Sequence, residues 1–309
     1  MLPKISVIMP NYNYAKFLEF SLGSICRQTI FPFECIVIDD ASTDNSIQII
    51  KKYKKLYPFI RLIENTSNQG AVNAIKLGLK ASIGDYVCFF SSDDTYNLDY
   101  IEKKLMMIQE YPKVGLYCSL ESYIDVDGNI IDKKNIINTS IKYFSPSQSF
   151  NLLKKGFFIA GHTAVINKKY LIEVGGFNEK MKWHCDWFAF TTIVLRYGFC
   201  YKNEVLCYMR MHKNTFSSSF QIWDRQKHVI KHLLDELNNR SFVDIKEKIL
   251  NRKIFFSLSF TRYYFMRYPS SLKMLSMNNL LNFMYCILIK ELCGLRLILK
   301  FIKIKLNIC

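Results

Sequence analysis

Apolar and polar residues alternate in blocks along the first 120 residues of this chain, at the periods of strands and helices. Short apolar runs predict buried strands, and the segments between them carry apolar residues at helical spacing. The predicted strands are residues 5–9, 34–40, 60–63, 86–90 and 114–118, and the predicted helices are 14–28, 44–57, 70–82 and 98–111. This rhythm predicts an α/β fold, with a mostly parallel sheet covered by helices on both faces.

Composition narrows the class of protein. A chain of 309 residues, half of them hydrophobic, is long enough for one main domain and an appendage. The ten cysteines are scattered and form no Cys-x-x-Cys pair, which argues against a disulfide framework or a zinc site. The start of the chain lacks the features of a signal peptide, and no long uncharged apolar stretch predicts a spanning helix. We therefore expect a cytoplasmic protein.

Polar residues follow four successive predicted strands. In parallel α/β sheets, ligands bind beyond the carboxyl ends of the strands, so these residues are the candidates for a site. Because the strand ends meet at one edge of the sheet, we expect them to line a single polar cleft. The four segments are residues 10–14, 39–44, 64–70 and 91–94.

The fourth strand end carries two adjacent carboxylates, Asp93 and Asp94, directly after the apolar run 87–90. A solvated turn would explain an isolated pair of this kind. A bound cation would explain it as well, because Mg²⁺ and Mn²⁺ prefer carboxylate and phosphate oxygens. The pair therefore indicates a divalent cation that carries a phosphate ester.

Taken in order, these segments resemble the family 2 glycosyltransferases, inverting enzymes with the GT-A nucleotide-sugar-binding fold. Residues 10–13 and 18–29 are similar to the opening signature of the family, residues 39–44 to its second block, and residues 68–74 to its third. The resemblance covers about two thirds of the chain. It implies a Rossmann-like, mostly parallel sheet flanked by helices in a domain at 1–220. Within that domain, a nucleotide-binding half spans 1–118 and an acceptor-binding half spans 119–220.

The resemblance places the donor nucleotide at the first three strand ends. Asp40, together with Asp39, is expected to accept the N3–H of a uracil or thymine base, and Pro10 and Tyr12 are expected to pack on that base. Asn68 belongs to the same nucleotide-binding set. Capping of the following helix is the alternative role for the acidic cluster.

The resemblance also implies a cofactor, Mn²⁺ or Mg²⁺. Asp94 is expected to ligate the cation, and Asp93 to contact the ribose or the metal shell. Farther along, His212 is expected to be a metal or phosphate ligand, and Arg210 to pair with phosphate. A bound cation stabilises the departing nucleoside diphosphate as a Lewis acid.

An inverting transferase needs a general base to deprotonate the acceptor hydroxyl. By the resemblance, the candidate is Asp186, which follows a Gly-Gly-Phe segment at 175–177. Its alternative role is to cap the helix predicted at 187–197, and Glu179 is a weaker candidate base. Two histidines are possible acceptor or phosphate contacts. His184 would tune Asp186 or touch the acceptor, and His162 is either an acceptor contact or a structural histidine.

Residues 221–309 depart from the transferase pattern and predict a basic, mainly helical extension. They hold 16 of the 42 Lys and Arg residues and 6 of the 26 Asp and Glu residues, a net charge of +10 against +6 for 1–220. A helix at 226–237 is amphipathic, and 255–268 and 279–307 mix apolar and aromatic residues with cations. This pattern is typical of helices that lie in a membrane interface, and the anionic inner face of the cytoplasmic membrane would attract their cations. Packing of these helices on the core is the alternative, and the absence of a nucleic-acid motif argues against nucleic acid.

The function that we expect is transfer of a sugar from a nucleoside-diphosphate sugar, UDP-linked ahead of dTDP- or GDP-linked, to a hydroxyl of a glycan or lipid-linked glycan. Surface polysaccharide biosynthesis is the expected context. One rival is a sugar nucleotidyltransferase, which needs a Gly-rich basic loop after the first strand; residues 10–14 do not supply one. The other rival is a nucleotide-binding scaffold without catalysis, which loss of Asp94 or Asp186 would indicate, and both are present.

Overall fold

The computed structural model describes residues 2–132, 140–212 and 223–251, with single positions at 254, 255, 275, 277, 280, 281, 283 and 284. The chain forms two compact units. The first comprises Met1–Phe150 and Phe158–Phe220, and the second comprises Asn151–Phe157 and Gln221–Cys309.

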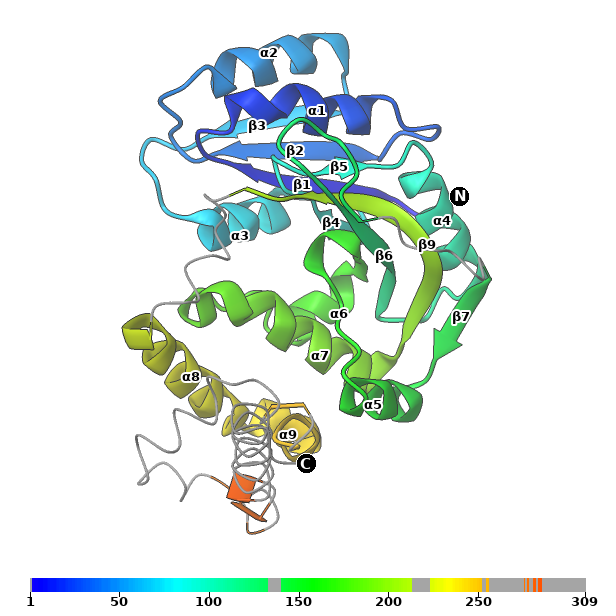
Figure 1. Ribbon diagram of the computed structural model, residues 1–309, viewed down its shortest axis with the longest axis vertical. Coiled ribbons are helices and arrows are strands. Elements are labelled where there is room, and N and C mark those ends of the chain that lie inside the picture. The colour runs from blue at the N-terminus through cyan, green and yellow to red at the C-terminus, as the bar shows by residue number, and fades with distance from the viewer. Residues whose placement is uncertain are drawn as a thin grey trace, which may run out of the picture. The chain divides into compact units, whose positions relative to one another are not determined.

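The first unit begins with the predicted alternation of strands and helices (Figure 1). The four opening strands pair in parallel, with β1 between β2 and β4. The nine predicted elements are all found, most with ends that differ by one or two residues. The elements of this half are β1 (Ile5–Asn11), α1 (Ala15–Cys26), β2 (Glu34–Asp39), α2 (Ser46–Leu56), β3 (Ile60–Glu64), α3 (Ala71–Ala81) and β4 (Tyr86–Phe89).

The rest of the unit extends the same sheet to the order β3-β2-β1-β4-β8-β6-β9-β5, with β7 also paired to β9. The pairing of β6 with β9 is parallel, whereas β8 is antiparallel to β4 and β6, and β5 and β7 are antiparallel to β9. The sheet is therefore mixed in this half. Its elements are β5 (Thr95–Tyr96), α4 (Tyr100–Glu110), β6 (Leu116–Ile124), β7 (Ile141–Phe144), α5 (Pro146–Lys154), η1 (Gly161–Thr163), β8 (Val165–Asn167), α6 (Lys168–Glu173), η2 (Glu179–His184), α7 (Cys185–Tyr197) and β9 (Phe199–Arg210). The part of α5 from Asn151 onward belongs to the second unit.

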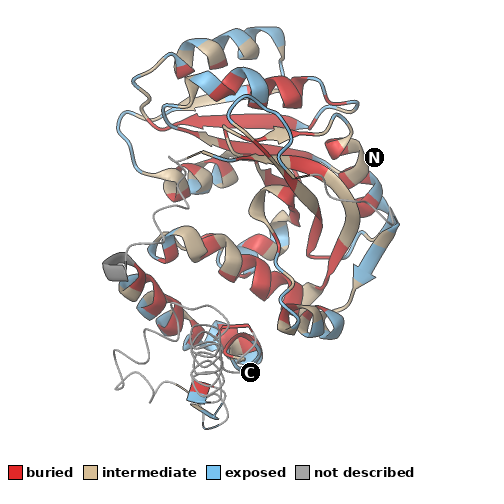
Figure 2. Cartoon of the chain, viewed as in Figure 1, coloured by how far each residue is buried: buried red, intermediate tan, exposed pale blue. Residues whose placement is uncertain are grey.

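Helices cover both faces of the sheet, so its central strands are buried (Figure 2). Helices α1 and α2 lie over one face and α3 over the other. The contact of α3 with the sheet depends on Gly78. A Cβ at Gly78 would lie 2.4 Å from Ile8 Cγ2 and 2.7 Å from Ile38 Cδ1, so only glycine permits this approach. Close packing here fixes the strand ends from which the site is built.

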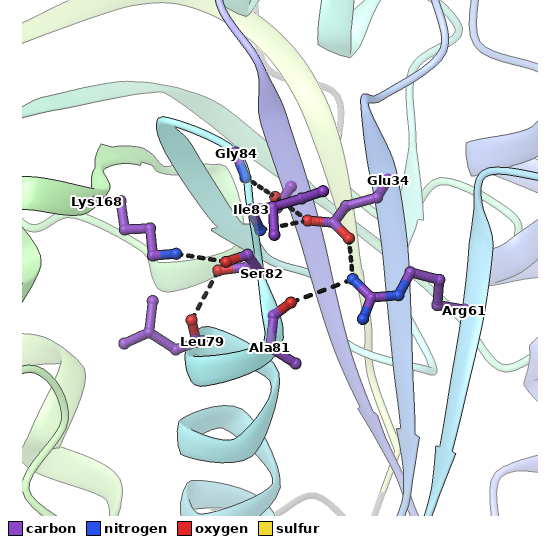
Figure 3. Close-up of polar contacts among 9 residues, drawn as sticks. Glu34, Arg61, Leu79, Ala81, Ser82, Ile83, Gly84 and Lys168 are labelled. Carbon is purple, nitrogen blue, oxygen red and sulfur yellow. Dashed lines mark hydrogen bonds and ion pairs between the residues drawn. The ribbon is translucent and has the colours of Figure 1, made fainter.

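The opposite edge of the sheet, where the parallel strands begin, is tied together by the buried carboxylate of Glu34 (Figure 3). Its Oε1 accepts 2.7 Å hydrogen bonds from Ser6 Oγ and from the main-chain N–H of Ile83. Its Oε2 pairs with Arg61, which also donates to the carbonyl of Ala81. One side chain thus joins β1, β2, β3 and the loop that leads into β4.

The second unit contains α8 (Trp223–Leu237), η4 (Arg240–Phe242) and α9 (Val243–Ile249). The helix predicted at 226–237 is confirmed, and its buried residues recur at helical spacing, at Val229, Ile230, Leu233, Leu234 and Leu237. The serine-rich stretch at 214–219 and most of the segments 255–268 and 279–307 lie outside the described residues. Among the helices that the structure describes, none has both the length and the apolar character needed to cross a bilayer.

Candidate active site

The loops after β1 and β2 interlock through side chains. Asp39 is fully buried and accepts hydrogen bonds from Asn11 Nδ2 at 2.7 Å and from both the main-chain N–H and Oγ of Ser42 at 2.8 Å. Asn13 Oδ1 in turn accepts from the N–H of Thr43. Asn13 and Ala41 both have positive φ, 57° and 63°, so each loop holds a residue in the left-handed region. Such strain is found where surrounding contacts hold a functional loop in place.

Asp40 is also buried, and its carboxylate organises the third strand end. It accepts hydrogen bonds from Asn65 Nδ2 at 2.8 Å and from the N–H groups of Gln69 and Gly70, the shortest at 2.7 Å. Asn68 accepts a hydrogen bond from the N–H of Gly70 in the same loop. These contacts fix the loop that enters α3, and they place Asp40, Asn65 and Asn68 together.

The predicted base-packing residues lie beside these loops. Tyr12 is exposed, and the carbonyl of Pro10 accepts a 2.8 Å hydrogen bond from Ser92 Oγ. Ser92 belongs to the loop after β4 that carries Asp93 and Asp94. The loops predicted to bind the nucleotide and the acidic loop are therefore joined directly.

Asp93 and Asp94 meet the end of β9. Asp94 is 3 % exposed, and its Oδ1 accepts a 2.9 Å hydrogen bond from the main-chain N–H of Arg210. Asp93 Oδ2 lies 2.8 Å from His212 Nε2. Burial, and then the neighbouring charge of Asp93, raise the pKa of the Asp94 carboxyl. The structure thus brings together the four residues that the sequence assigned to metal and phosphate binding, across more than 110 positions of sequence.

The Arg210 side chain is used mainly within the protein. Its Nε donates to the carbonyl of Asp93 at 2.8 Å, and its Nη1 donates to the carbonyls of Asp125 and Val126, each at 2.9 Å. The guanidinium carbon lies 5.0 Å from the ring centroids of Phe17 and Phe20 on α1. Nη2 is buried and is the guanidinium nitrogen without a partner among the described residues. Arg210 therefore connects the acidic loop, the turn after β6 and α1.

A divalent cation fits this donor set, which supplies part of its shell and leaves the rest to substrate oxygens. Within the described residues, no three His, Cys, Asp or Glu side chains form a closed metal site. Mg²⁺, however, is commonly held by one or two carboxylates while substrate phosphates complete its shell. Asp93 and Asp94 supply two carboxylates. Burial and then the charge of Asp93 raise the pKa of Asp94, and a cation held by both carboxylates would relieve their repulsion.

Asp186 lies in the first turn of α7, with Oδ1 accepting a 2.7 Å hydrogen bond from the N–H of Trp187. Burial raises its pKa, and the nearby His162 opposes that shift. The other oxygen, Oδ2, faces Gly161, where a Cβ would lie only 3.1 Å from it. The structure thus brings Asp186 and His162 together, and the raised pKa moves the carboxylate toward the range useful for a general base.

The two remaining candidates lie on η2, just before α7. Glu179 is partly exposed and forms a 2.8 Å ion pair with Lys76 on α3; the hydrogen bond and charge of Lys76 lower the pKa of Glu179. A lowered pKa makes this carboxylate the weaker base of the two. The ring of His184 lies 6.2 Å from that of Trp183.

Aromatic side chains around the acidic pair were not predicted. The ring of Phe17 lies 5.2 Å from that of His212, and the ring of Tyr14 lies 5.9 Å from it. Burial and the charges of Asp93 and Asp94 raise the pKa of Tyr14. The sequence offered one signal for Tyr14, its place in the polar segment after β1. Its contacts with His212, Asp93 and Asp94 could not be predicted, because those residues are distant in the sequence.

Comparison with known proteins gives one family. The family model described as "Glycosyl transferase family 2" matches residues 6–175, more than half of the chain. The putative teichuronic acid biosynthesis glycosyltransferase TuaG of Bacillus subtilis is 35 % identical over 131 residues, 42 % of this chain and 52 % of TuaG. The poly(ribitol-phosphate) beta-N-acetylglucosaminyltransferase TarP of Staphylococcus aureus is 35 % identical over 153 residues, 45 % of this chain and 46 % of TarP. The matches thus span about half of these relatives.

Solved structures share the fold. The complex of S. aureus TarS with UDP-GlcNAc has a TM-score of 0.64 at 19 % identity, over 92 % of this chain and 79 % of that one. The mannosyltransferase PcManGT of Pyrobaculum calidifontis, in complex with GDP-Man and Mn²⁺, has a TM-score of 0.59 at 19 % identity, over 96 % of this chain and 81 % of that one. The predicted fold class, a GT-A sheet flanked by helices with a helical C-terminal portion, is confirmed.

Proposed function

The chain belongs to glycosyl transferase family 2, and from that premise we propose that it is an inverting, metal-dependent transferase that moves a sugar from a UDP-sugar to a hydroxyl of a glycan. One observation carries the proposal. Asp93 and the buried Asp94 lie at a strand end together with His212 and Arg210, beside loops organised by Asp39 and Asp40. The names of TuaG and TarP and the UDP-GlcNAc bound to TarS support a nucleotide-sugar donor and a surface polysaccharide as the product.

In this proposal the donor nucleotide lies over the loops after β1, β2 and β3. Pro10 and Tyr12 pack on the base, and Asp40 accepts its N3–H, with Asp39 and Asn68 holding the loops in position. Both carboxylates already accept hydrogen bonds within the protein. Each carboxylate oxygen has two acceptor sites, so one further hydrogen bond from the base is compatible with these contacts.

Asp93, Asp94 and His212 would hold Mn²⁺ or Mg²⁺ together with the diphosphate, and Arg210 would pair with the same diphosphate through Nη2. When bound, the cation supplies charge stabilisation to the leaving diphosphate. The Mn²⁺ in the PcManGT complex supports this assignment. The protein's own contribution is to keep both carboxylates in place, through the N–H of Arg210 and the ring of His212.

Asp186 is the proposed general base. Its Oδ1 is occupied by the N–H of Trp187, which leaves Oδ2 to accept the proton of the acceptor hydroxyl. The acceptor oxygen then attacks the anomeric carbon from the face opposite the diphosphate, so the configuration inverts. His162 and His184 lie near the base and are proposed to contact the acceptor.

We assign the enzyme to the cytoplasm, at the inner face of the membrane, with 221–309 as a membrane-contacting region. The net charge of +10 on that region supports attraction to anionic lipid. Growing surface glycans carried on lipid would be presented at the same place.

Calorimetric titration with UDP, dTDP and GDP, with and without Mn²⁺, tests the site. We expect Mn²⁺-dependent binding of UDP to the wild type and its loss in Asp94→Asn, an exchange that preserves shape but removes the charge. Asp85→Asn, at an exposed carboxylate on the opposite edge of the sheet, is the control and should bind as the wild type does. Binding of no nucleotide by a folded wild-type protein would overturn the proposal, and binding of GDP alone would correct the donor.

A further inference from the structure

Three of the four parallel strands begin with the same local pattern, a proline flanked by apolar or cationic residues. Leu2-Pro3-Lys4 precedes β1, Phe31-Pro32-Phe33 precedes β2, and Tyr57-Pro58-Phe59 precedes β3. Because the strands are parallel, their starts meet at one edge of the sheet, opposite the candidate active site. We call residues 2–4, 31–33, 54–59 and 83–85 the strand-start face. The proposed function makes no use of it.

The strand-start face is unusually apolar for a surface. A soluble protein normally exposes large hydrophobic residues singly, and a group of them at one place marks an interaction site. On the strand-start face, by contrast, five large hydrophobic side chains are exposed together. They are Leu2 at 58 %, Phe31 at 53 %, Phe33 at 42 %, Leu56 at 64 % and Ile83 at 67 %.

These side chains are held in place by contacts along the edge. The ring of Phe31 stacks on Phe59 at 5.0 Å, and Tyr57 lies 5.9 Å from Phe59. Lys4 Nζ lies 4.7 Å from the ring centroid of Phe33. Prolines restrict the backbone between them, so little conformational entropy is lost when the face binds a partner.

Glu34 fixes the other end of the face (Figure 3). It follows Phe33 directly, and its carboxylate accepts the N–H of Ile83 at 2.7 Å. The loop that carries Ile83 is thereby tied to the start of β2. The apolar residues that precede β2 and β4 are therefore held beside one another.

The charge of the face is positive. Its described ranges contain three lysines, Lys4, Lys54 and Lys55, all exposed, and one acid, Asp85. Apolar tips beside lysines match the surface of an anionic bilayer, where side chains such as Phe and Leu enter the headgroup region and lysines meet lipid phosphates. A second copy of the chain is a poorer match, because a symmetric contact would oppose the same lysines.

We infer that the strand-start face binds the surface of an anionic membrane. This contact is additional to the one proposed for 221–309, and it does not depend on the chemistry at the active site. Each residue of β1 rises about 3.3 Å, so its seven residues hold the candidate site about 20 Å or more above such a membrane. An enzyme held in this way would reach glycan ends that extend from the bilayer in preference to a sugar attached directly to the lipid.

Vesicle co-sedimentation of the full chain tests the inference. Vesicles of equimolar phosphatidylglycerol and phosphatidylcholine should bind the wild type, and pure phosphatidylcholine vesicles should bind it less. The double variant Phe31→Ser/Phe33→Ser should reduce binding at least about tenfold. The pair Lys54→Gln/Lys55→Gln should reduce it about fivefold for each lysine and weaken its salt dependence.

Matched variants elsewhere on the first unit control for surface chemistry. Leu98→Ser/Met106→Ser replaces two exposed apolar residues at and beside α4, and Lys180→Gln/Lys182→Gln replaces two exposed lysines on η2. Both pairs should bind vesicles as the wild type does. Melting temperatures of all variants separate loss of binding from loss of fold.

A tryptophan probe locates the contact directly. In Phe31→Trp, vesicles should shift the emission of the added indole to the blue, and in Leu98→Trp they should leave it unchanged. Equal binding by the wild type and a folded Phe31→Ser/Phe33→Ser variant would overturn the inference, since it would assign any membrane contact to another region. Binding to soluble polyphosphate without binding to vesicles would also overturn it.

Discussion

The main-chain N–H of Arg210 donates a 2.9 Å hydrogen bond to Asp94 Oδ1, while the side chain of the same arginine donates to the carbonyl of Asp93. One residue at the end of β9 thus holds both members of the acidic pair. Its remaining bonds, to the carbonyls of Asp125 and Val126, bring the turn after β6 against the same loop. The acidic pair is therefore positioned by a residue that the sequence suggested only as a phosphate contact.

Replacing Arg210 distinguishes a role in positioning the acidic pair from a role in binding phosphate. In Arg210→Lys, the single ammonium cannot reproduce the fork of donors, so buried carbonyls lose their partners. We expect the free energy of unfolding to fall by about 1–3 kcal/mol and Mn²⁺ affinity to fall about tenfold or more, because the carboxylates are less well oriented. Thermal unfolding and Mn²⁺ titration by electron paramagnetic resonance, without any nucleotide, measure both effects.

The exposed Arg27 provides the matched control for that experiment, and Arg27→Lys should change neither quantity. If Arg210 acted only on phosphate, Arg210→Lys would keep its stability and its Mn²⁺ affinity and lose only UDP binding. That pattern would contradict a positioning role.

Gly161 is predicted to leave the space that the carboxylate of Asp186, the proposed base, needs to keep its position. A methyl group at this position would lie 3.1 Å from Asp186 Oδ2, tighter than ordinary van der Waals contact, so the carboxylate must move by a few tenths of an ångström. Misplacement of a reacting group lowers the rate steeply, and we expect Gly161→Ala to lower kcat about tenfold while leaving the Kd for UDP unchanged. Steady-state kinetics and calorimetry distinguish the two quantities.

The loss of kcat in Asp186→Asn is the reference with which the loss in Gly161→Ala is compared. It should reduce kcat by about 10²–10⁴-fold, the usual contribution of a general base. Unchanged kcat in a folded Asp186→Asn protein would exclude Asp186 as the base, and Glu179→Gln would then be tested in the same way.

Local patterns were enough to predict the first half of the sheet. Each strand from β1 to β4 is a short apolar run, and each helix between them has one apolar face, so both signals lie within a few residues. The strand-end rule then placed Asp39, Asp40, Asp93 and Asp94 at one edge. These predictions needed no knowledge of distant contacts.

The second half of the sheet and the contacts of Arg210 depend on the pairing of strands that lie far apart in the sequence. β8 runs antiparallel between β4 and β6, and β9 returns Arg210 to Asp94 across 116 positions. Periodicity contains no information on such partners, since any apolar strand can pair with many others. The contacts of Phe17 and Phe20 with Arg210 were missed for the same reason, because both residues fit a helix face equally well without them.

Ala41 is predicted to store strain in the loop between β2 and α2. Its φ of 63° lies in the left-handed region, which costs about 1–2 kcal/mol for a residue with a Cβ. Ala41→Gly removes that strain but gives the unfolded chain more freedom, so we expect a net gain of about 0.5–1 kcal/mol in the free energy of unfolding. Urea denaturation measures it. Ala160, with a φ of −73° and similar exposure, is the control, and Ala160→Gly should destabilise instead.

Lys104 on α4 is predicted to make stability rise with pH. Its side chain is fully buried, with Nζ 3.3 Å from the carbonyl of Tyr117 and 5.1 Å from the ring of Tyr100, and burial lowers the pKa of Lys104 from 10.5 to about 8. Between those two values the unfolded chain binds more protons than the folded protein, so the free energy of unfolding increases with pH. The full shift corresponds to about 3 kcal/mol. Below pH 8 the buried ammonium is charged and destabilises the fold.

Urea denaturation of the wild type and of Lys104→Met at several pH values from 7 to 10 tests this directly. The methionine fits the same apolar space without a charge, so Lys104→Met should be the more stable protein at pH 7. Its advantage should shrink as the pH passes through about 8 and approaches 10.5, because Lys104 in the wild type becomes neutral in both states. Tyrosines and cysteines also titrate in this range, but they are common to both proteins and cancel in the difference. A difference in stability that stays constant with pH would show that Lys104 keeps its ordinary pKa, through polar contacts beyond the carbonyl of Tyr117.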